Sequence, residues 1–320
     1  MAAAAPLPRP AAALPYRPAS TRRAVAEALF AVVVWGATFV ATKRALVDAS
    51  PAFVVAIRSG LGALVLAGVA AWRGEMAVLP FRLLAKLAFL GFLGIGFHQW
   101  LQAQALMTSD ASAAAWLVTV SPIFTALLGR TMLGERLGWI GVTGIAVAAL
   151  GVLWVVARGD LGHLAASGFG TMGDFLMLFS ALNWSIYTVL SRRVLRAQPA
   201  GRTTFYVLLF GGLFSALWWI AAPGGSLGAS VAKISAGAWI SIAFLGILGS
   251  ALAPLAWNDA LETIPAARLS VFLYLEPPIT TALAVAIGQE SWRWATLWGG
   301  LLIVLGVSMV NLRRLGSGRH

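Results

Sequence analysis

Three ionisable side chains lie inside long apolar segments of this sequence: Arg58, His98 and Glu276. A charge at the centre of a lipid bilayer costs about 2.5–3.5 kcal/mol on insertion scales, so such residues persist where they face a bundle interior or a water-filled cavity. Each of the three is therefore a candidate for binding a polar solute or for carrying a proton.

Glu276 is followed by Pro277 and Pro278, which lack backbone N–H donors and bend a helix. The carbonyl groups freed by such a bend can line a cavity beside the carboxylate. Ser121 and Pro122 form a similar site earlier in the chain. We expect Glu276 to bind a substrate ammonium group or to take a proton, with the three prolines as hinges. The alternative is a carboxylate that only stabilises the kink.

Arg58 and His98 each allow two interpretations. The Arg58 guanidinium can bind a substrate carboxylate through paired hydrogen bonds, or it can extend to the lipid headgroups. His98 and Gln102 share one helical face at spacing i, i+4. Because imidazole titrates near neutrality, His98 is a candidate for proton coupling; the alternative is a hydrogen-bonded structural histidine.

Trp35, Asn183 and Tyr187 are predicted near mid-depth, and their side chains can stack on or hydrogen-bond to an organic solute, or simply fill space. The complete set of candidate residues combines these with the charged and hydroxyl-bearing positions. The predicted substrate-binding residues are Trp35, Thr38, Arg58, His98, Gln102, Ser121, Asn183, Tyr187, Tyr274 and Glu276, and the predicted hinges are Pro122, Pro277 and Pro278.

The elements that must position these residues are membrane-spanning helices. Hydrophobic residues make up 60% of the 320 positions and charged residues 11%, against roughly 45–50% and about 25% in soluble domains. Unbroken apolar runs of about 20 residues fit spanning helices and not barrel strands. Ten such spans are predicted, at 24–42, 51–72, 83–106, 111–133, 137–157, 172–191, 203–222, 238–260, 266–288 and 294–312.

The formal charge of +12 comes from Lys and Arg in the short gaps between these runs, where basic residues determine membrane orientation. Their distribution predicts both termini in the cytoplasm of a bacterial-type inner membrane, and it excludes a nucleic-acid partner. Lys43 and Arg44 are the locally discordant pair, because they fall on the outer side.

The chain also contains an internal repeat. A shift of 155 positions pairs Pro122 with Pro277, Glu135 with Glu290 and Trp139 with Trp294; a shift of 149 pairs Trp35 with Trp184. Five crossings is an odd number, so the second copy should enter from the opposite side, which gives an inverted repeat. The predicted organisation is a tail at 1–23, repeats at 24–157 and 172–312 joined by a linker at 158–171, and a tail at 313–320.

Several site classes are excluded by composition. The chain has no cysteine, its three histidines are scattered, and it has no glycine-rich phosphate loop ending in Lys-Ser/Thr. We therefore predict no metal, no cofactor, no catalytic residues and no ATP-driven step. Paired glycines such as Gly91/Gly94 and Gly246/Gly249 are interpreted as sites of close helix contact.

At this point the chain resembles the drug/metabolite transporter superfamily, specifically its ten-helix permeases with two EamA domains. The motifs that carry the resemblance are Trp35-Gly36-Ala37-Thr38-Phe39, Ala105-Leu106-Met107-Thr108-Ser109, Ser121-Pro122-Ile123-Phe124-Thr125, Leu133-Gly134-Glu135-Arg136 and Leu275-Glu276-Pro277. The resemblance implies export of small solutes such as amino acids through a central cavity lined by the first four helices of each half.

Three rival functions remain open from the sequence. An inverted repeat has no inherent direction, so an uptake permease for a nucleoside or another metabolite fits the same pattern. An intramembrane enzyme acting on lipid-linked substrates should carry paired acidic residues, and Asp259 with Glu262 is the nearest approach. A scaffold without transport would leave Glu276 unexplained. Protons are the candidate coupling ion, the lipid bilayer and a small-molecule substrate are the predicted partners, and the sequence does not define an oligomeric state.

Overall fold

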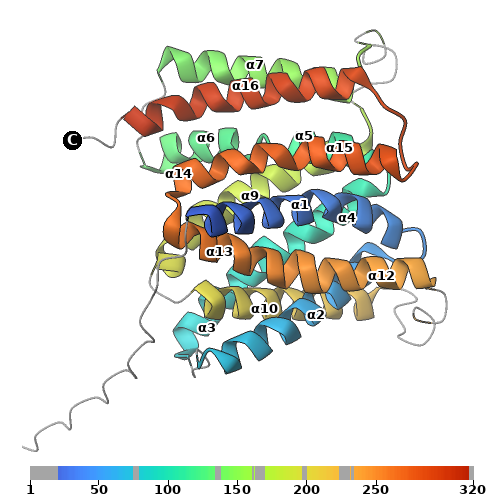
Figure 1. The fold of residues 1–320 in the computed structure, drawn as a ribbon, viewed down its shortest axis with the longest axis vertical. Helices are drawn as coiled ribbons and strands as arrows, with labels where there is room; N and C mark the ends of the chain where they lie inside the picture. Colours follow the sequence, from blue (N-terminus) through green and yellow to red (C-terminus); the bar gives the residue numbers. More distant parts are fainter. Residues whose placement is uncertain are drawn as a thin grey trace, which may run out of the picture.

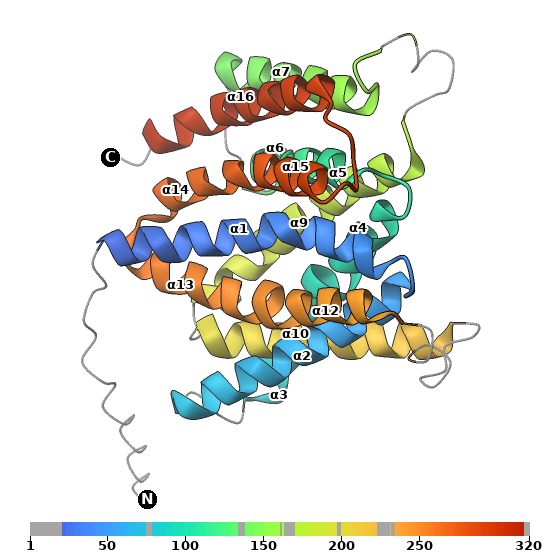
Figure 2. The same ribbon diagram turned by 45° about the vertical axis from the view of Figure 1, so that its right-hand side comes forward.

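The computed structural model describes residues 21–74, 79–133, 138–160, 162, 170–196, 200–222, 231 and 234–316, and every regular element in these ranges is helical. The helices lie alongside one another in a bundle (Figures 1 and 2). α1 (Thr21–Ala45) occupies the middle of the bundle and is flanked on both sides by helices from the second half of the chain. The fold class is therefore all-α, as predicted.

The remaining elements follow in chain order. Those up to residue 156 are α2 (Pro51–Trp72), α3 (Phe81–Gly91), the π-helix η1 (Phe92–Phe97), α4 (His98–Leu106), α5 (Ala111–Val118), α6 (Ser121–Leu133) and α7 (Trp139–Val156). Those after residue 170 are α9 (Met172–Arg196), α10 (Ala200–Ala221), α12 (Ala236–Phe244), the π-helix η2 (Leu245–Leu252), α13 (Ala253–Thr263), α14 (Ala266–Leu269), the 3₁₀-helix η3 (Ser270–Leu275), α15 (Glu276–Ala286) and α16 (Trp294–Gly316).

Local sequence explains several helix starts. Ser50 precedes α2 and its hydroxyl accepts a hydrogen bond from the Phe53 N–H, while Pro51 occupies the first helical position, where a missing N–H costs nothing. Ser235 caps α12 in the same way, by accepting from the Ala238 N–H. The short polar gaps of the sequence thus end one helix and begin the next.

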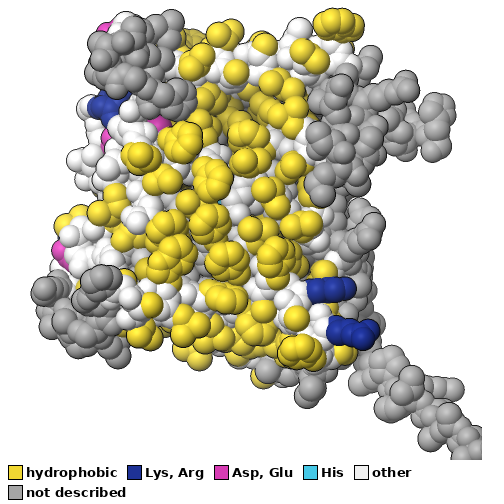
Figure 3. Space-filling view, turned by 180° about the vertical axis from the view of Figure 1, so that it is seen from behind, with side chains coloured by type: hydrophobic (Ala, Val, Ile, Leu, Met, Phe, Trp, Pro, Cys, Tyr) yellow, Lys and Arg dark blue, Asp and Glu magenta, His cyan; other side chains and the backbone are white. Residues whose placement is uncertain are grey.

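Seven helical stretches of the described chain are long and apolar enough to cross a membrane. They are Thr21–Ala45, Pro51–Trp72, Phe81–Leu106, Ala111–Leu128, Trp139–Val156, Gly201–Ala221 and Ala236–Thr263. Two shorter apolar stretches, Ser270–Ala286 and Trp294–Val310, lie where further spans are predicted. The surface agrees with a membrane setting, because apolar side chains form a broad band whose visible charged residues lie toward its edges (Figure 3).

Two predicted spans are interrupted at their prolines. α5 ends at Val118 and α6 begins at Ser121, with Pro122 in its first turn; η3 ends at Leu275 and α15 begins at Glu276, with Pro277 and Pro278 in its first turn. A proline fits the first turn of a helix, where its missing N–H leaves no hydrogen bond unmade. Glu276, directly before Pro277, keeps α-helical dihedral angles (φ −58°, ψ −52°), so the chain changes from 3₁₀ to α geometry there without leaving the helical region.

Glycines bring α7 and α16 into close contact along one edge of the bundle (Figure 1). A Cβ atom at Gly144 would lie 2.6 Å from the Gly306 carbonyl oxygen, and one at Gly151 would lie 2.6 Å from the Gly299 carbonyl oxygen. The contacts run in opposite chain order, so the two helices are antiparallel. The same kind of contact joins α2 to η2 through Gly62 and Gly246.

Candidate functional site

A narrow polar cavity of about 10 Å³, which is room for about one water molecule, lies between α1, α2 and α4. Its walls carry three polar side chains from α1 and α2 and two glutamines from α4. The lining residues are Thr38, Phe39, Thr42, Val54, Val55, Arg58, Gln99, Gln102, Ala103 and Leu106. Every one of them belongs to the first half of the chain.

Arg58 is the one charged residue that lines this cavity, and it is buried, with 8% of its surface exposed. Its Nε donates a hydrogen bond of 3.3 Å to the Ser250 hydroxyl on η2. Among the described residues no carboxylate forms an ion pair with it. A buried positive charge without a counter-charge is costly, which sets Arg58 apart from an arginine that merely stabilises the fold.

The two glutamines face the cavity from successive turns of α4. The Gln99 Oε1 atom is buried and accepts no hydrogen bond from the described residues. Gln102 was predicted to bind substrate and Gln99 was not, because His98 and Gln102 share one helical face. The side of α4 that faces the cavity differs from the side that faces α9 only in which helix packs against it. The local sequence does not report which helix that is.

His98 is buried on the other side of α4, toward α9. Its Nδ1 lies 2.9 Å from the Ser180 hydroxyl, and its ring centroid lies 4.7 Å from that of Trp184. Asn183 is also buried and donates to the Leu93 carbonyl oxygen at 2.8 Å. Both side chains have protein partners, as in the structural alternative considered for His98.

The predicted aromatic residues take part in close helix contacts. Trp35 Nε1 donates to the Gly249 carbonyl oxygen at 3.3 Å, and its ring lies 5.3 Å from that of Trp257. The Tyr187 ring covers Gly94, where a Cβ atom would lie 2.5 Å from the ring. These contacts join α1 to η2 and α9 to η1.

Glu276 begins α15 and is half-buried, and its backbone carbonyl accepts from the Thr280 hydroxyl. None of the described side chains forms an ion pair or a hydrogen bond with its carboxylate. Tyr274 is half-buried on η3, and Ser121 is buried at the start of α6, where its carbonyl oxygen accepts from the Ser185 hydroxyl. The structure therefore brings Thr38, Arg58 and Gln102 together in one cavity and leaves the other predicted residues outside its lining.

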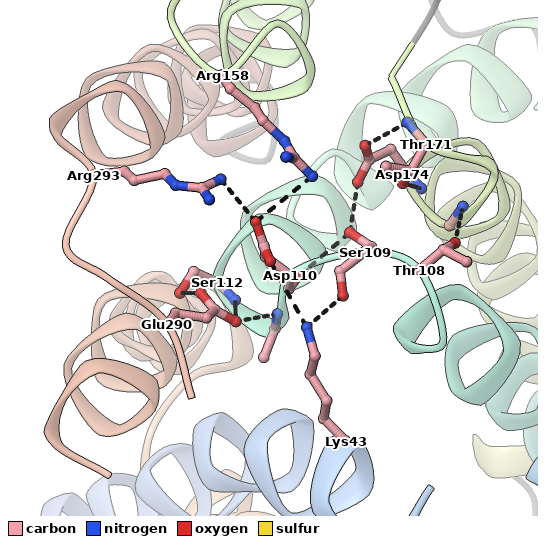
Figure 4. Close-up of polar contacts among 12 residues, drawn as sticks. Lys43, Thr108, Ser109, Asp110, Ser112, Arg158, Thr171, Asp174, Glu290 and Arg293 are labelled. Atoms are coloured by element: carbon pink, nitrogen blue, oxygen red, sulfur yellow. Dashed lines mark hydrogen bonds and ion pairs between the residues drawn. The ribbon is translucent and has the colours of Figure 1, made fainter. Parts of the chain in front are cut away.

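A cluster of charged side chains gathers around Asp110 (Figure 4). Asp110 precedes α5 and receives Arg293 at 2.9 Å, Lys43 at 3.8 Å and Arg158 at 3.9 Å. Lys43 also donates to the Ser109 carbonyl oxygen at 2.8 Å. We call these four charged residues the Asp110 cluster. It pairs one carboxylate with three cations predicted on the outer side, including the discordant Lys43.

Two further carboxylates accept hydrogen bonds from residues next to Asp110. Glu290 accepts hydrogen bonds from the Ala111 and Ser112 backbone N–H groups, so it caps α5 of the other half instead of the helix that follows it. Asp174 accepts from the Ser109 hydroxyl and from the Thr171 N–H. The residue predicted as the counterpart of Glu290, Glu135, lies outside the described residues.

A third link between the halves lies outside the spans. Asp48, in the connection after α1, accepts hydrogen bonds from the Ser235 hydroxyl and from the Ser235 N–H at the start of α12. These hydrogen bonds, helped by the charge of Arg44, lower the pKa of Asp48 below its ordinary value of 3.8. The described residues contain no group of three His, Asp or Glu side chains that could hold a metal ion.

Comparison with known proteins identifies the family. The EamA-like transporter family matches residues 22–157 and 171–312, which is most of the chain. The chain belongs to the EamA-like transporter family. It is thus a multi-pass membrane protein of the drug/metabolite transporter type, as its motifs indicated.

Relatives of this EamA-like transporter come from several organisms. The uncharacterized transporter YyaM of Bacillus subtilis is 29% identical over 85% of this chain and 88% of its own. A protein described as a probable terminal-alkyne amino-acid exporter of Streptantibioticus cattleyicolor is 28% identical over 93% and 96% of the two chains. One crystal structure matches 92% of this chain and 99% of its own at a TM-score of 0.64 and 24% identity, which shows a shared fold.

Proposed function

We propose that this EamA-like transporter exports small polar metabolites, most closely amino acids or related compounds, from a bacterial-type cytoplasm by alternating access. The observation that carries the proposal is the polar cavity beside Arg58: among the described residues the guanidinium has no carboxylate partner, and the buried Gln99 Oε1 atom has no hydrogen-bond partner. The relative described as an amino-acid exporter supports the solute class. Substrate-binding roles for Trp35, His98, Asn183, Tyr187 and Glu276 belong to the same proposal.

The proposed scaffold is ten helices in two inverted repeats, at 24–157 and 172–312, with both termini cytoplasmic. The glycine contacts support it: a shift of 155 positions turns Gly144 into Gly299 and Gly151 into Gly306, so each α7–α16 contact becomes the other. Exchanging contacts between antiparallel helices are expected of two copies related by an axis in the membrane plane.

The irregular segments support the same scaffold. A shift of 155 positions moves η1 into η2, and it moves the start of α6 onto the start of α15. Both copies would therefore carry a π-helix and a proline-started helix at matching places. Such segments are weak points of regular hydrogen bonding, where a helix can change direction when the halves move.

A counterflow assay tests the function. Purified protein in proteoliposomes is loaded with unlabelled solute and offered a panel of labelled amino acids, nucleosides and cationic drugs. We expect accelerated entry of labelled amino acids into loaded vesicles. Movement of nucleosides alone would favour the rival permease, and turnover of an added lipid-linked substrate without any solute movement would contradict transport.

A further inference from the structure

The cavity between α1, α2 and α4 combines a positive charge with a glutamine oxygen that has no hydrogen-bond partner among the described residues. Arg58 contributes its guanidinium, of which only Nε has a partner, the Ser250 hydroxyl. Gln99 contributes a buried carbonyl oxygen without a donor. Nearly all buried polar groups in proteins are hydrogen-bonded, so unpaired donors and acceptors on one small cavity point to a ligand that supplies the missing partners.

The charges of the residues around the cavity indicate the charge of the ligand. Lys43 directly follows the lining residue Thr42, but it already donates to Ser109 and pairs with Asp110. Arg58 is then the one lining cation, and it has no acid partner among the described residues. A single guanidinium is matched by a single negative charge, and its planar donors suit a carboxylate bound by two parallel hydrogen bonds.

We propose that this cavity is the carboxylate subsite of the transported solute, with Arg58 as the anchor and Gln99 as a specificity residue. The proposal rests on the transport function proposed above and narrows its substrates to monocarboxylates that carry an N–H or O–H donor close to the carboxylate. The Gln99 carbonyl oxygen accepts from that donor. A phosphate monoester, with a charge near −1.5 to −2, would exceed the single positive charge and is disfavoured.

Ser250 is the positioning residue of this subsite. It lies on η2, in the second half of the chain, while every lining residue belongs to the first half. Its hydroxyl fixes Arg58 Nε, so it orients the remaining guanidinium nitrogens without facing the cavity itself. A movement of η2 against α2 would therefore alter the orientation of the anchor.

Ligand binding to the purified full-length protein tests the subsite independently of transport. The probes are L-leucine, N-acetyl-L-leucine, L-leucinamide and inorganic phosphate, and the readout is the ligand-induced increase in melting temperature. We expect both carboxylates to stabilise the protein and leucinamide and phosphate not to do so. The two leucine derivatives separate the contribution of the carboxylate from that of the ammonium group.

Variants assign the effect to residues. Arg58→Gln should weaken carboxylate binding by tenfold or more, and Gln99→Glu should do the same without loss of fold, because the new carboxylate would occupy the anchor. Ser250→Ala should weaken binding several-fold and keep the preference for leucine over leucinamide. Gln104→Leu, on the same helix but outside the lining, is the matched control and should bind normally.

Three results would each overturn the subsite. The first is equal stabilisation by leucinamide and leucine, and the second is unchanged binding by Arg58→Gln and Gln99→Glu. The third is no stabilisation by either carboxylate. Counterflow of labelled solutes separates this failure from failure of the proposed function. Solute movement without carboxylate selectivity would retain the transporter and remove the subsite. Carboxylate binding without any solute movement would retain the subsite and contradict transport.

Discussion

Polar side chains inside the bundle differ in whether other groups of the protein form hydrogen bonds or ion pairs with them. His98, Asn183 and Ser185 all have hydrogen-bond partners on neighbouring helices, as most buried polar residues do. Arg58 has one partner, and the Glu276 carboxylate has none among the described residues. The protein therefore holds one basic and one acidic side chain that its own described side chains do not pair in an ion pair, and these are the residues whose loss should affect transport most.

Replacement of Glu276 by glutamine should abolish most transport. The substitution keeps the shape of the side chain and removes its charge, and a hydrogen bond to a charged group contributes about 1.5–3 kcal/mol, or roughly tenfold or more in rate. Counterflow in proteoliposomes measures the rate, and membrane yield verifies insertion. Glu262→Gln, an exposed glutamate at the end of α13, is the control. Unchanged transport by Glu276→Gln would reduce Glu276 to a support of the helix break.

The sequence predicted part of the cavity. Thr38, Arg58 and Gln102 were identified because hydroxyl, charged and amide groups are unusual within apolar runs, and all three line the cavity. Gln99 was missed and His98 was favoured, since positions 98, 99 and 102 all fit one broad helical face. The deciding factor is tertiary: Ser180 on α9 lies opposite His98, and no local pattern reports which helix will pack there.

At the scale of the elements, regular α-helices alternate with short π-helical, 3₁₀-helical and turn segments. The predicted span 51–72 coincides with α2, because Ser50 and Pro51 give a clear start signal. The π-helices η1 and η2 were not predicted, because an added residue in a helical turn leaves no recognisable pattern in composition. The changes of helix geometry before Ser121 and Glu276 were anticipated only as proline bends, because the local sequence does not distinguish 3₁₀ from α geometry in the preceding turn.

Substitution of Gly144 by valine should separate α7 from α16. A Cβ atom at this position would lie 2.6 Å from a backbone carbonyl oxygen, which cannot move aside as a side chain could. Overpacking of this kind costs about 1–3 kcal/mol. The melting temperature of the purified protein measures the loss, and Gly68→Val on α2, where nothing lies within 4 Å, is the matched control. Equal melting temperatures for the two variants would contradict the close contact.

The Asp48–Ser235 link should make stability sensitive to acid. The pKa of Asp48 is lowered in the folded protein, so its stabilisation is complete above the ordinary value of 3.8 and is lost as the pH falls through the lowered pKa. Thermal unfolding of the wild type and of Asp48→Asn at several pH values between 6 and 3 measures this effect. We expect the wild type to be the more stable at pH 6 and the difference to shrink below pH 4. A constant difference would remove Asp48 as the cause.

At the scale of the whole molecule, the Asp110 cluster and Glu290 join parts of the chain that are distant in sequence. The Asp110 cluster draws its cations from α1, from the end of α7 and from the residue before α16, so one carboxylate joins three connections that are distant in sequence (Figure 4). Glu290 adds a cap from the second half onto α5 of the first. If these segments separate under alternating access, these contacts must then break.

Replacement of Asp110 by asparagine should favour separation of these segments. It leaves three cations without their shared carboxylate, and exposed ion pairs contribute about 0.2–1 kcal/mol each. Because the chain has no cysteine, a single cysteine at Thr42 reports access through its rate of labelling by a membrane-impermeant maleimide. We expect several-fold faster labelling in Asp110→Asn. Asp259→Asn, which removes only the Arg73 pair, should leave the rate unchanged, and an unchanged rate in both would contradict a closing role.

Asp110 and its three cations are between 28% and 45% exposed, so dissolved salt reaches them. The Debye length falls from about 10 Å at 0.1 M ionic strength to about 3 Å at 1 M, and exposed pairs weaken accordingly. In the part of the chain that the structure describes, no other carboxylate gathers three cations. A rise in ionic strength on the face that carries Asp110 is thus expected to weaken contacts between these segments, and an uncharged solute at the same osmolarity is expected to leave them intact.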